Sequence, residues 1–300
     1  MLLTVGSFFS GICAEKWALD GLHIPHKHVF ACEYDKFAAQ FIAQNIDTNV
    51  IVEDLRTVDV STLPRVHLFL SSPPCQGFSS LGPRQASDLR KDLWRRSLAY
   101  AAARKPRVFV LENVPAFQKS NGFHELIAAL QQIYRFVGHT VLNAADFGSV
   151  QSRKRLFVVA QNRTFAFPTP QKHGTPPPLS VVLDDPRTAF RYLTEKQKAY
   201  LESRARWGVK IYGRRYRGHV GTLCKSYGHS WVTWKHIVEE TNGRLRNITP
   251  SEAFELMGYR YNGFEFKSLS NRRRYYLAGN TISKEVLTSL FQGLAIRTVL

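Results

Sequence analysis

The sequence predicts an α/β fold in which helices cover a mostly parallel sheet and a small second domain is inserted. Apolar stretches typical of buried strands alternate with amphipathic stretches typical of helices, and acidic residues directly follow several of the predicted strands. From residue 168 to about residue 245 the chain is irregular and begins with a proline-rich linker. We therefore predict one domain from residues 1–167 plus 246–300, and an inserted domain at residues 168–245.

The first three predicted strands cover residues 4–10, 28–32 and 49–52. The first leads into a turn at Gly11 and a helix, as in nucleotide-binding units, although one glycine is a weaker signature than G-x-G-x-x-G. The second ends at Glu33, about twenty residues after the turn, where a carboxylate can bind a ribose. The third ends at Glu53-Asp54. Each acid alone is compatible with an ordinary strand end or helix cap, but their succession favours an adenosine site.

Cys75 is the candidate nucleophile. It follows an apolar strand predicted at residues 65–70 and the Pro73-Pro74 pair, which stiffens the local backbone. This arrangement delivers the thiol to the carboxyl end of a strand, where ligands bind in α/β sheets. Most free cysteines are instead small buried hydrophobes. We assign that packing role to Cys13, Cys32 and Cys224.

Glu112 directly follows the apolar strand predicted at residues 107–111. A carboxylate in this position is either capped by neighbouring amides or held with a raised pKa for proton transfer. We favour a catalytic role, because the same edge of the sheet is expected to carry Cys75.

Two arginines precede the last strand of the first domain. Arg153 and Arg155 alternate along an extended segment, which places both guanidinium groups on one face. Surface arginines often serve only solubility, but this pair enters a predicted strand. The other predicted elements are a helix at residues 123–136, paired strands at 140–144 and 156–160, and a terminal helix at 284–298.

The net charge of +18 is concentrated after the proposed nucleophile. Residues 1–75 hold 5 Lys or Arg against 8 Asp or Glu, whereas residues 76–165 hold 14 against 5 and residues 166–300 hold 22 against 10. A solvated basic face is the ordinary explanation, but a one-sided excess of this size usually marks a polyanionic partner. Aromatic residues interleave with the basic ones in the inserted domain, which suits groove contacts and stacking. Nucleic acid is therefore the favoured partner.

The cysteines and apolar runs argue against several classes of protein. The four cysteines have neither disulfide nor zinc-ligand spacing, which indicates a reducing compartment and no metal site. The amino terminus lacks a basic leader with a long apolar region, and no apolar run reaches transmembrane length. We expect a soluble intracellular protein without a membrane partner.

Together these motifs resemble the cytosine-C5 DNA methyltransferase family over nearly the whole chain. The motifs are Phe9-Ser10-Gly11-Ile12-Cys13, Pro74-Cys75-Gln76, Glu112-Asn113-Val114, Gln151-x-Arg153-x-Arg155, Arg246-x-x-Thr249-x-x-Glu252 and Gly279-Asn280-Thr281-Ile282. Cys13 departs from the family pattern where a second glycine is usual, and Thr281 stands where serine is common. Thr249 and Glu252 also have the spacing of a helix capping box. The order and spacing of the whole set make the resemblance specific.

The resemblance implies a Rossmann-like, S-adenosylmethionine-dependent methyltransferase domain, with residues 168–245 as its target-recognition domain. It implies that Glu33 binds the ribose of S-adenosylmethionine, that Tyr34 packs on the adenine, and that Asp54 binds the adenine amino group. It implies no metal ion. The full set of implied cofactor-binding residues is Phe9, Gly11, Glu33, Tyr34, Asp54, Leu55, Pro74, Asn280 and Thr281.

The implied reaction is methylation of C5 of a cytosine that is flipped out of double-stranded DNA at a specific short sequence. Cys75 would add to C6 and make C5 nucleophilic, while Glu112 would hold or protonate N3. Arg155, with Arg153 beside it, would place positive charge near O2. We expect a monomer on DNA. A cognate restriction endonuclease, where one exists, is expected to act separately. In a prokaryote we expect the protein in the cytoplasm, associated with the nucleoid. In a eukaryote we expect it in the nucleus.

Three other functions are alternatives to this one. An RNA cytosine methyltransferase would use the same scaffold and chemistry, and the basic charge fits either polymer. A catalytically silent nucleic-acid-binding relative is disfavoured because Cys75, Glu112 and Arg155 are all present. A nucleotide-dependent oxidoreductase would leave Pro74-Cys75-Gln76 and the basic excess unexplained.

Overall fold

The computed structural model describes residues 2–74, 92–170, 176–187, 190–203, 208–230 and 233–296. The chain divides into two compact units by its packing. Unit 1 consists of Met1–Asn143, Lys154–Pro170 and Val286–Leu300, and unit 2 consists of Ala144–Arg153 and Gln171–Glu285. The sequence predicts a division by role, with catalysis in residues 1–167 plus 246–300 and recognition in residues 168–245. That division stays a prediction. By packing alone, residues 246–285 belong with unit 2.

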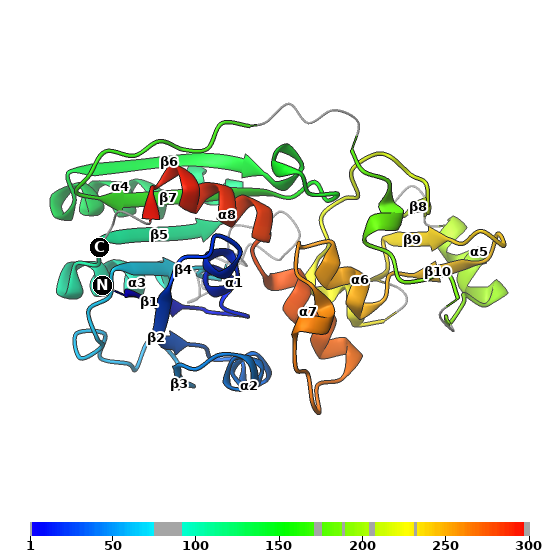
Figure 1. Ribbon diagram of the computed structural model, residues 1–300, viewed down its shortest axis with the longest axis horizontal. Coiled ribbons are helices and arrows are strands. Elements are labelled where there is room, and N and C mark those ends of the chain that lie inside the picture. Colours follow the sequence, from blue (N-terminus) through cyan, green and yellow to red (C-terminus); the bar gives the residue numbers. More distant parts are fainter. Residues whose placement is uncertain are drawn as a thin grey trace. The chain divides into compact units, whose positions relative to one another are not determined.

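The described part of unit 1 is built on a seven-stranded sheet in the order β3-β2-β1-β4-β5-β7-β6 (Figure 1). Strands β1 to β5 are parallel, whereas β7 is antiparallel to both β5 and β6. The predicted α/β fold with a mostly parallel sheet is therefore confirmed. The strands are β1 (Leu3–Phe8), β2 (His26–Cys32), β3 (Asn49–Ile51), β4 (Leu68–Ser71), β5 (Val108–Asn113), β6 (Phe136–Asn143) and β7 (Lys154–Gln161).

The central strands are buried along their whole length, which explains their continuous apolar sequences. All residues of β4 and β5 are buried. Parallel strands that are covered on both faces have this pattern instead of an alternation of apolar and polar residues. Phe8, Phe69 and Tyr100 pack within this core, with ring centroids 4.4 to 5.4 Å apart. Burial of each such ring contributes roughly 1.5–3 kcal/mol, so this cluster anchors β1 and β4.

The helices α2 and α4 of unit 1 begin at side chains that satisfy free backbone N–H groups. Asp35 accepts two such bonds at the start of α2 (Lys36–Asn45), and Ser120 accepts one at the start of α4 (Asn121–Ile133). Caps of this kind contribute about 1 kcal/mol each. The described part of unit 1 also contains α1 (Ala14–Gly21), α3 (Trp94–Arg104) and, from Val286 on, α8 (Lys284–Gly293). No helix in the described ranges has the length and apolarity that a membrane span requires.

The described part of unit 2 contains a three-stranded sheet in the order β10-β9-β8. Strand β8 (Lys210–Gly213) is parallel to β9 (His236–Glu239), and β9 is antiparallel to β10 (Leu245–Asn247). The predicted capping box is confirmed, since the Thr249 hydroxyl accepts the Glu252 N–H and the Glu252 carboxylate accepts the Thr249 N–H. The helices of this unit are α5 (Glu195–Ser203), α6 (Pro250–Glu255) and α7 (Asn271–Asn280), and the 3-10 turn η6 covers Lys225–Gly228.

A buried ionic network joins β9, β10 and α6. The Arg246 side chain is 1% exposed and donates to both carboxylate oxygens of Glu252, at 2.7 and 2.8 Å, and to Glu240 at 2.8 Å. Arg214 also donates to Glu240, at 3.0 Å. Removing one partner of a buried ion pair costs about 3–5 kcal/mol, because the other charge stays buried without compensation. The spacing Arg246-x-x-Thr249-x-x-Glu252 thus has a structural reason in this chain.

Candidate active site

The turn after β1 is held in a constrained conformation beside the end of β2. Phe9, Gly11 and Cys13 all have positive φ angles, of 54°, 58° and 53°. Only glycine adopts this region freely, so the two other residues must be held by their surroundings. The Ser10 hydroxyl lies 3.2 Å from the carbonyl oxygen of Cys32, to which it donates, and the Gly11 N–H donates to Glu33 Oε2 at 2.8 Å. A Cβ added at Gly11 would meet nothing within 4 Å, so open space faces the turn.

Glu33 connects this turn to the start of α2. Its Oε2 accepts the Gly11 N–H, and its Oε1 accepts the Asp35 N–H at 2.9 Å. Burial raises the pKa of this carboxyl above its usual value, and the backbone N–H donors oppose that rise. Because each carboxylate oxygen has two acceptor positions, Glu33 retains capacity for a ligand hydroxyl. Tyr34, directly after it, is 74% exposed.

The end of β3 places a second carboxylate near the end of β2, since Cys32 pairs with Ile51. Asp54 accepts hydrogen bonds from the side chain and backbone of Arg56, and these bonds lower the pKa of its carboxyl. Leu55 is buried. Val52 is 51% exposed and offers an apolar surface that the sequence analysis did not single out. The sequence could have indicated this surface, because Val52 is an apolar residue directly before two acids.

Glu112 and Arg155 meet at the end of β5. Arg155 Nε donates to Glu112 Oε1 at 3.0 Å, and the two side chains are 18% and 11% exposed. The antiparallel register of β5 and β7 brings them together, because Glu112 pairs with Phe157 and Asn113 with Leu156. The pair offers both hydrogen-bond donors and acceptors at the carboxyl edge of the sheet.

Arg153 has a different environment from Arg155. Its side chain is buried and donates to the carbonyl oxygens of Leu223, Gly279 and Thr281, at 3.0 to 3.1 Å. These bonds fix the end of α7 within unit 2, so Arg153 has a structural role there. A direct catalytic role for Arg153 stays a prediction, as does cofactor binding by Thr281 and by the exposed Asn280.

The predicted nucleophile, Cys75, lies outside the described residues, which end at Pro74 and resume at Asp92. Before it, the Ser72 N–H donates to the carbonyl oxygen of Phe8 at 3.2 Å. The Asn113 side chain donates to the carbonyl oxygen of Pro73 at 3.3 Å. The described chain therefore runs to Pro74 beside the ends of β1 and β5. Asn113 belongs to the Glu112-Asn113-Val114 motif. Only the structure shows that its side chain binds the carbonyl oxygen of Pro73.

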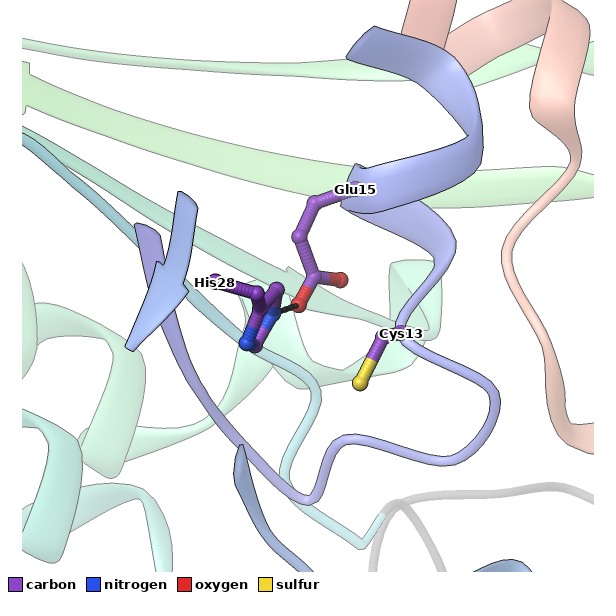
Figure 2. Close-up of side chains that lie close together, drawn as sticks. All are labelled: Cys13, Glu15 and His28. Atoms are coloured by element: carbon purple, nitrogen blue, oxygen red, sulfur yellow. Dashed lines mark hydrogen bonds and ion pairs between the residues drawn. The ribbon is translucent and has the colours of Figure 1, made fainter. Parts of the chain in front are cut away.

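A buried cluster of Cys13, Glu15 and His28 lies at the start of α1 (Figure 2). Their candidate ligand atoms lie within 4.8 Å of one another. However, His28 Nε2 and Glu15 Oε1 are 2.6 Å apart, which is a hydrogen-bond distance and shorter than two metal bonds of about 2 Å would leave between tetrahedral ligands. The pair links α1 to β2. Burial and the nearby Glu15 raise the pKa of the Cys13 thiol well above its usual value, as expected for a packing cysteine.

A family model described as C-5 cytosine-specific DNA methylase matches residues 3–295. The type II methyltransferase M.Bsp6I of Bacillus sp. (strain RFL6) is 28% identical over 98% of both chains. M.MspI of Moraxella sp. is also 28% identical, over 91% of this chain and 66% of its own length. The Entamoeba histolytica methyltransferase EhMeth has a similar structure, with a TM-score of 0.81, 22% identity and coverage of 98% of each chain. With a match that spans nearly its whole length, the chain belongs to the C-5 cytosine-specific DNA methylase family.

Proposed function

We propose that this chain transfers a methyl group from S-adenosylmethionine to C5 of a cytosine flipped out of double-stranded DNA, at a specific short sequence and through a covalent bond between Cys75 and C6. The Glu112–Arg155 pair at the end of β5 carries the proposal, with a 3.0 Å contact between its charged groups. Strand β5 pairs with β4, after which the chain continues through Pro73-Pro74 to Cys75. The family supplies cytosine C5 as the target.

The ends of β1, β2 and β3 support the assignment of the cofactor site. Open space at Gly11 and the remaining acceptor capacity of Glu33 fit a ribose, which we assign to Glu33. We assign the adenine ring to the exposed Tyr34 and its amino group to Asp54, which would share its carboxylate with Arg56. Once bound, S-adenosylmethionine supplies an electrophilic methyl group. Phe9, Leu55 and Pro74 are the further contacts proposed within unit 1.

The protein's own residues account for the activation of the base. Addition of the Cys75 thiolate to C6 breaks the C5=C6 double bond and moves its electron pair into the ring toward N3. Glu112 then holds or protonates N3, which lowers the cost of that charge. Arg155 keeps N–H donors beyond those bound to Glu112 and to the Lys154 carbonyl oxygen, and these stabilise negative charge at O2. Methylation of C5, loss of the C5 proton and departure of Cys75 complete the reaction. Because C6 is inaccessible within a duplex, the base must be flipped out first.

A methylation assay with defined substrates tests this proposal. The purified full chain is incubated with labelled S-adenosylmethionine and either duplex DNA or transfer RNA, and the modified position in DNA is read by bisulfite sequencing. We expect label in DNA only, at C5 of cytosine within one short sequence, and none with Cys75→Ser. Label in transfer RNA alone would replace DNA by RNA as the substrate. Label in DNA at a base other than cytosine would contradict the proposed chemistry.

A further inference from the structure

Four short segments lie side by side at the amino-end edge of the unit 1 sheet, opposite the edge that carries Glu112. Residues 64–67 lead into β4, residues 104–107 into β5 and residues 134–136 into β6, while residues 161–164 lie at the end of the antiparallel strand β7. The register aligns them, because Leu68 pairs with Val108, Val108 with Gln161, and Gln161 with Phe136. In Figure 1 the arrow of β5 points away from this edge. Neighbouring strands are about 4.8 Å apart, so the segments form one continuous row.

This row carries a dense positive charge. Its four segments hold six Lys or Arg residues and no Asp or Glu. Arg104 is partly buried and donates to the carbonyl oxygen of Ser61. The other five are exposed, and we call them the basic ledge: Arg65, Lys105, Arg107, Arg135 and Arg163.

His67 responds to this charge. Its Nδ1 accepts the Thr4 N–H at 3.0 Å, which requires that nitrogen to be unprotonated. Burial lowers the pKa of His67 below its usual value, and the positive charges of Arg107 and Arg65 lower it further. Two of the ledge residues, Arg65 and Arg107, therefore act on the same neighbouring group.

We propose that the basic ledge binds the phosphate backbone of a second duplex DNA segment, apart from the segment that enters the active site. Arg107 and Glu112 lie at opposite ends of β5, roughly 17 Å apart at the usual rise per residue. The two surfaces therefore face opposite edges of one sheet and serve different segments. A protein with both surfaces can hold one stretch of DNA while it acts on another.

The composition of the ledge favours a duplex phosphate backbone over other polyanions. Four of its five cations are arginines, whose planar donors form paired hydrogen bonds to phosphate. The row spans four strands, or about 14 Å, and a duplex presents one negative charge per about 1.7 Å of its axis. The aromatic residues of the segments, Tyr134 and Phe136, are buried and half-buried, so they offer no exposed ring for stacking on unpaired bases or for insertion into lipid.

The test measures whether one protein brings two DNA segments together. The full chain is mixed with donor-labelled and acceptor-labelled duplexes of about 20 base pairs, which is about two helical turns, and energy transfer between duplexes is recorded. The ledge variant is Arg65→Gln/Lys105→Gln/Arg135→Gln. We expect wild-type protein to give energy transfer, and the ledge variant to need at least about tenfold more protein for the same signal, because it loses three phosphate contacts.

Two further variants make the result specific. A control variant removes the same charge at cations outside residues 168–245 that are already paired with neighbouring acids, and it should behave as wild type. These cations are Lys16, Arg95 and Lys267, paired with Asp20, Glu125 and Glu265. The charge-retaining variant Arg65→Lys/Lys105→Arg/Arg135→Lys should keep energy transfer. Equal energy transfer by wild type and ledge variant would overturn the proposal, since protein dimers with one duplex each would then explain the signal.

Two other readouts separate the ledge from the active site. Methylation of a duplex just long enough to cover one target should be the same in the ledge variant and wild type, and energy transfer needs no methyl transfer at all. The energy-transfer test would therefore still decide whether the ledge binds DNA, even if the chain did not methylate DNA. Duplex DNA at the ledge should also move the pKa of His67 upward, as followed by NMR, because phosphates offset Arg65 and Arg107. No change in that pKa, or second-site binding of RNA but not of duplex DNA, would contradict the proposal.

Discussion

Glu33 combines two tasks in one carboxylate. It accepts backbone N–H groups from the Gly11 turn and from the start of α2, and we propose that it also binds the ribose of the cofactor. Without the carboxylate, both N–H groups would lose their partner, and unsatisfied polar groups of this kind cost about 1–3 kcal/mol each. Ligand binding and turn geometry are therefore coupled at this residue.

Substitution of the two proposed site acids should separate cofactor binding from chemistry. Glu33→Ala should weaken S-adenosylmethionine binding at least about tenfold, the equivalent of one lost hydrogen bond to a charged group, while DNA binding changes little. Glu112→Gln should lower the methylation rate without changing cofactor affinity. Isothermal titration calorimetry measures both affinities. Glu125→Ala is the matched control, since Glu125 is exposed on α4 and lies outside the proposed cofactor site; unchanged cofactor binding in Glu33→Ala would reject its ribose assignment.

A duplex with 5-fluorocytosine at the target position tests Cys75 as the nucleophile. Once C5 is methylated, fluorine cannot leave as a proton does, so elimination stalls and protein and DNA stay covalently joined. The adduct should survive denaturing electrophoresis and be absent with Cys75→Ser, because a serine hydroxyl is almost never ionised near neutral pH. Cys13→Ser and Cys32→Ser should still form it, as both thiols are buried. A full adduct yield from Cys75→Ser would exclude the proposed mechanism.

At the scale of elements, strand burial made the sheet predictable. The apolar runs at residues 65–70 and 107–111 correspond to β4 and β5, because both strands are buried throughout. Helix ends were less predictable. The helix expected over residues 123–136 ends at Ile133, and Phe136 instead opens β6, where it pairs with Gln161. The terminal helix ends at Gly293 rather than at residue 298. Tertiary pairing and packing decide these ends, and neither has a local signal.

The candidate site could be predicted only in part for the same reason. Glu33 and Glu112 follow strands directly, so their placement was visible in the sequence. The contact between Glu112 and Arg155 required the antiparallel register of β5 and β7. Arg153 was paired with Arg155 by local alternation, but its carbonyl partners lie 70 to 128 residues away in the chain. Sequence-spacing rules describe local secondary structure, so they do not relate residues that lie so far apart in the chain.

The contact between α7 and η6 gives a test of packing. A Cβ at Gly279 would lie 2.4 Å from the backbone nitrogen of Lys225, so that one of the two elements must move. Gly279→Ala should therefore lower the free energy of unfolding by about 1–3 kcal/mol, as overpacking does. Gly263→Ala is the control, because nothing lies within 4 Å of a Cβ there. Urea denaturation of both variants measures the difference, and equal stability would mean that the α7 contact adjusts without strain.

For the molecule as a whole, the distribution of charge predicts how DNA binding depends on salt. The net charge is +18, and residues 76–300 hold 36 Lys or Arg against 15 Asp or Glu. Each phosphate that these cations neutralise releases bound counterions, so added salt opposes binding. A protein with six to ten phosphate contacts loses roughly 10³–10⁵-fold in affinity between 50 and 200 mM salt.

We expect a loss of that order for wild-type protein and a shallower slope for Arg65→Gln/Lys105→Gln/Arg135→Gln on long DNA, measured by fluorescence anisotropy. A single duplex that covers one target, kept at trace concentration, occupies the active site and cannot reach the ledge at the same time, so the two slopes should coincide on it. An affinity that barely changes with salt would contradict an electrostatic interaction with nucleic acid.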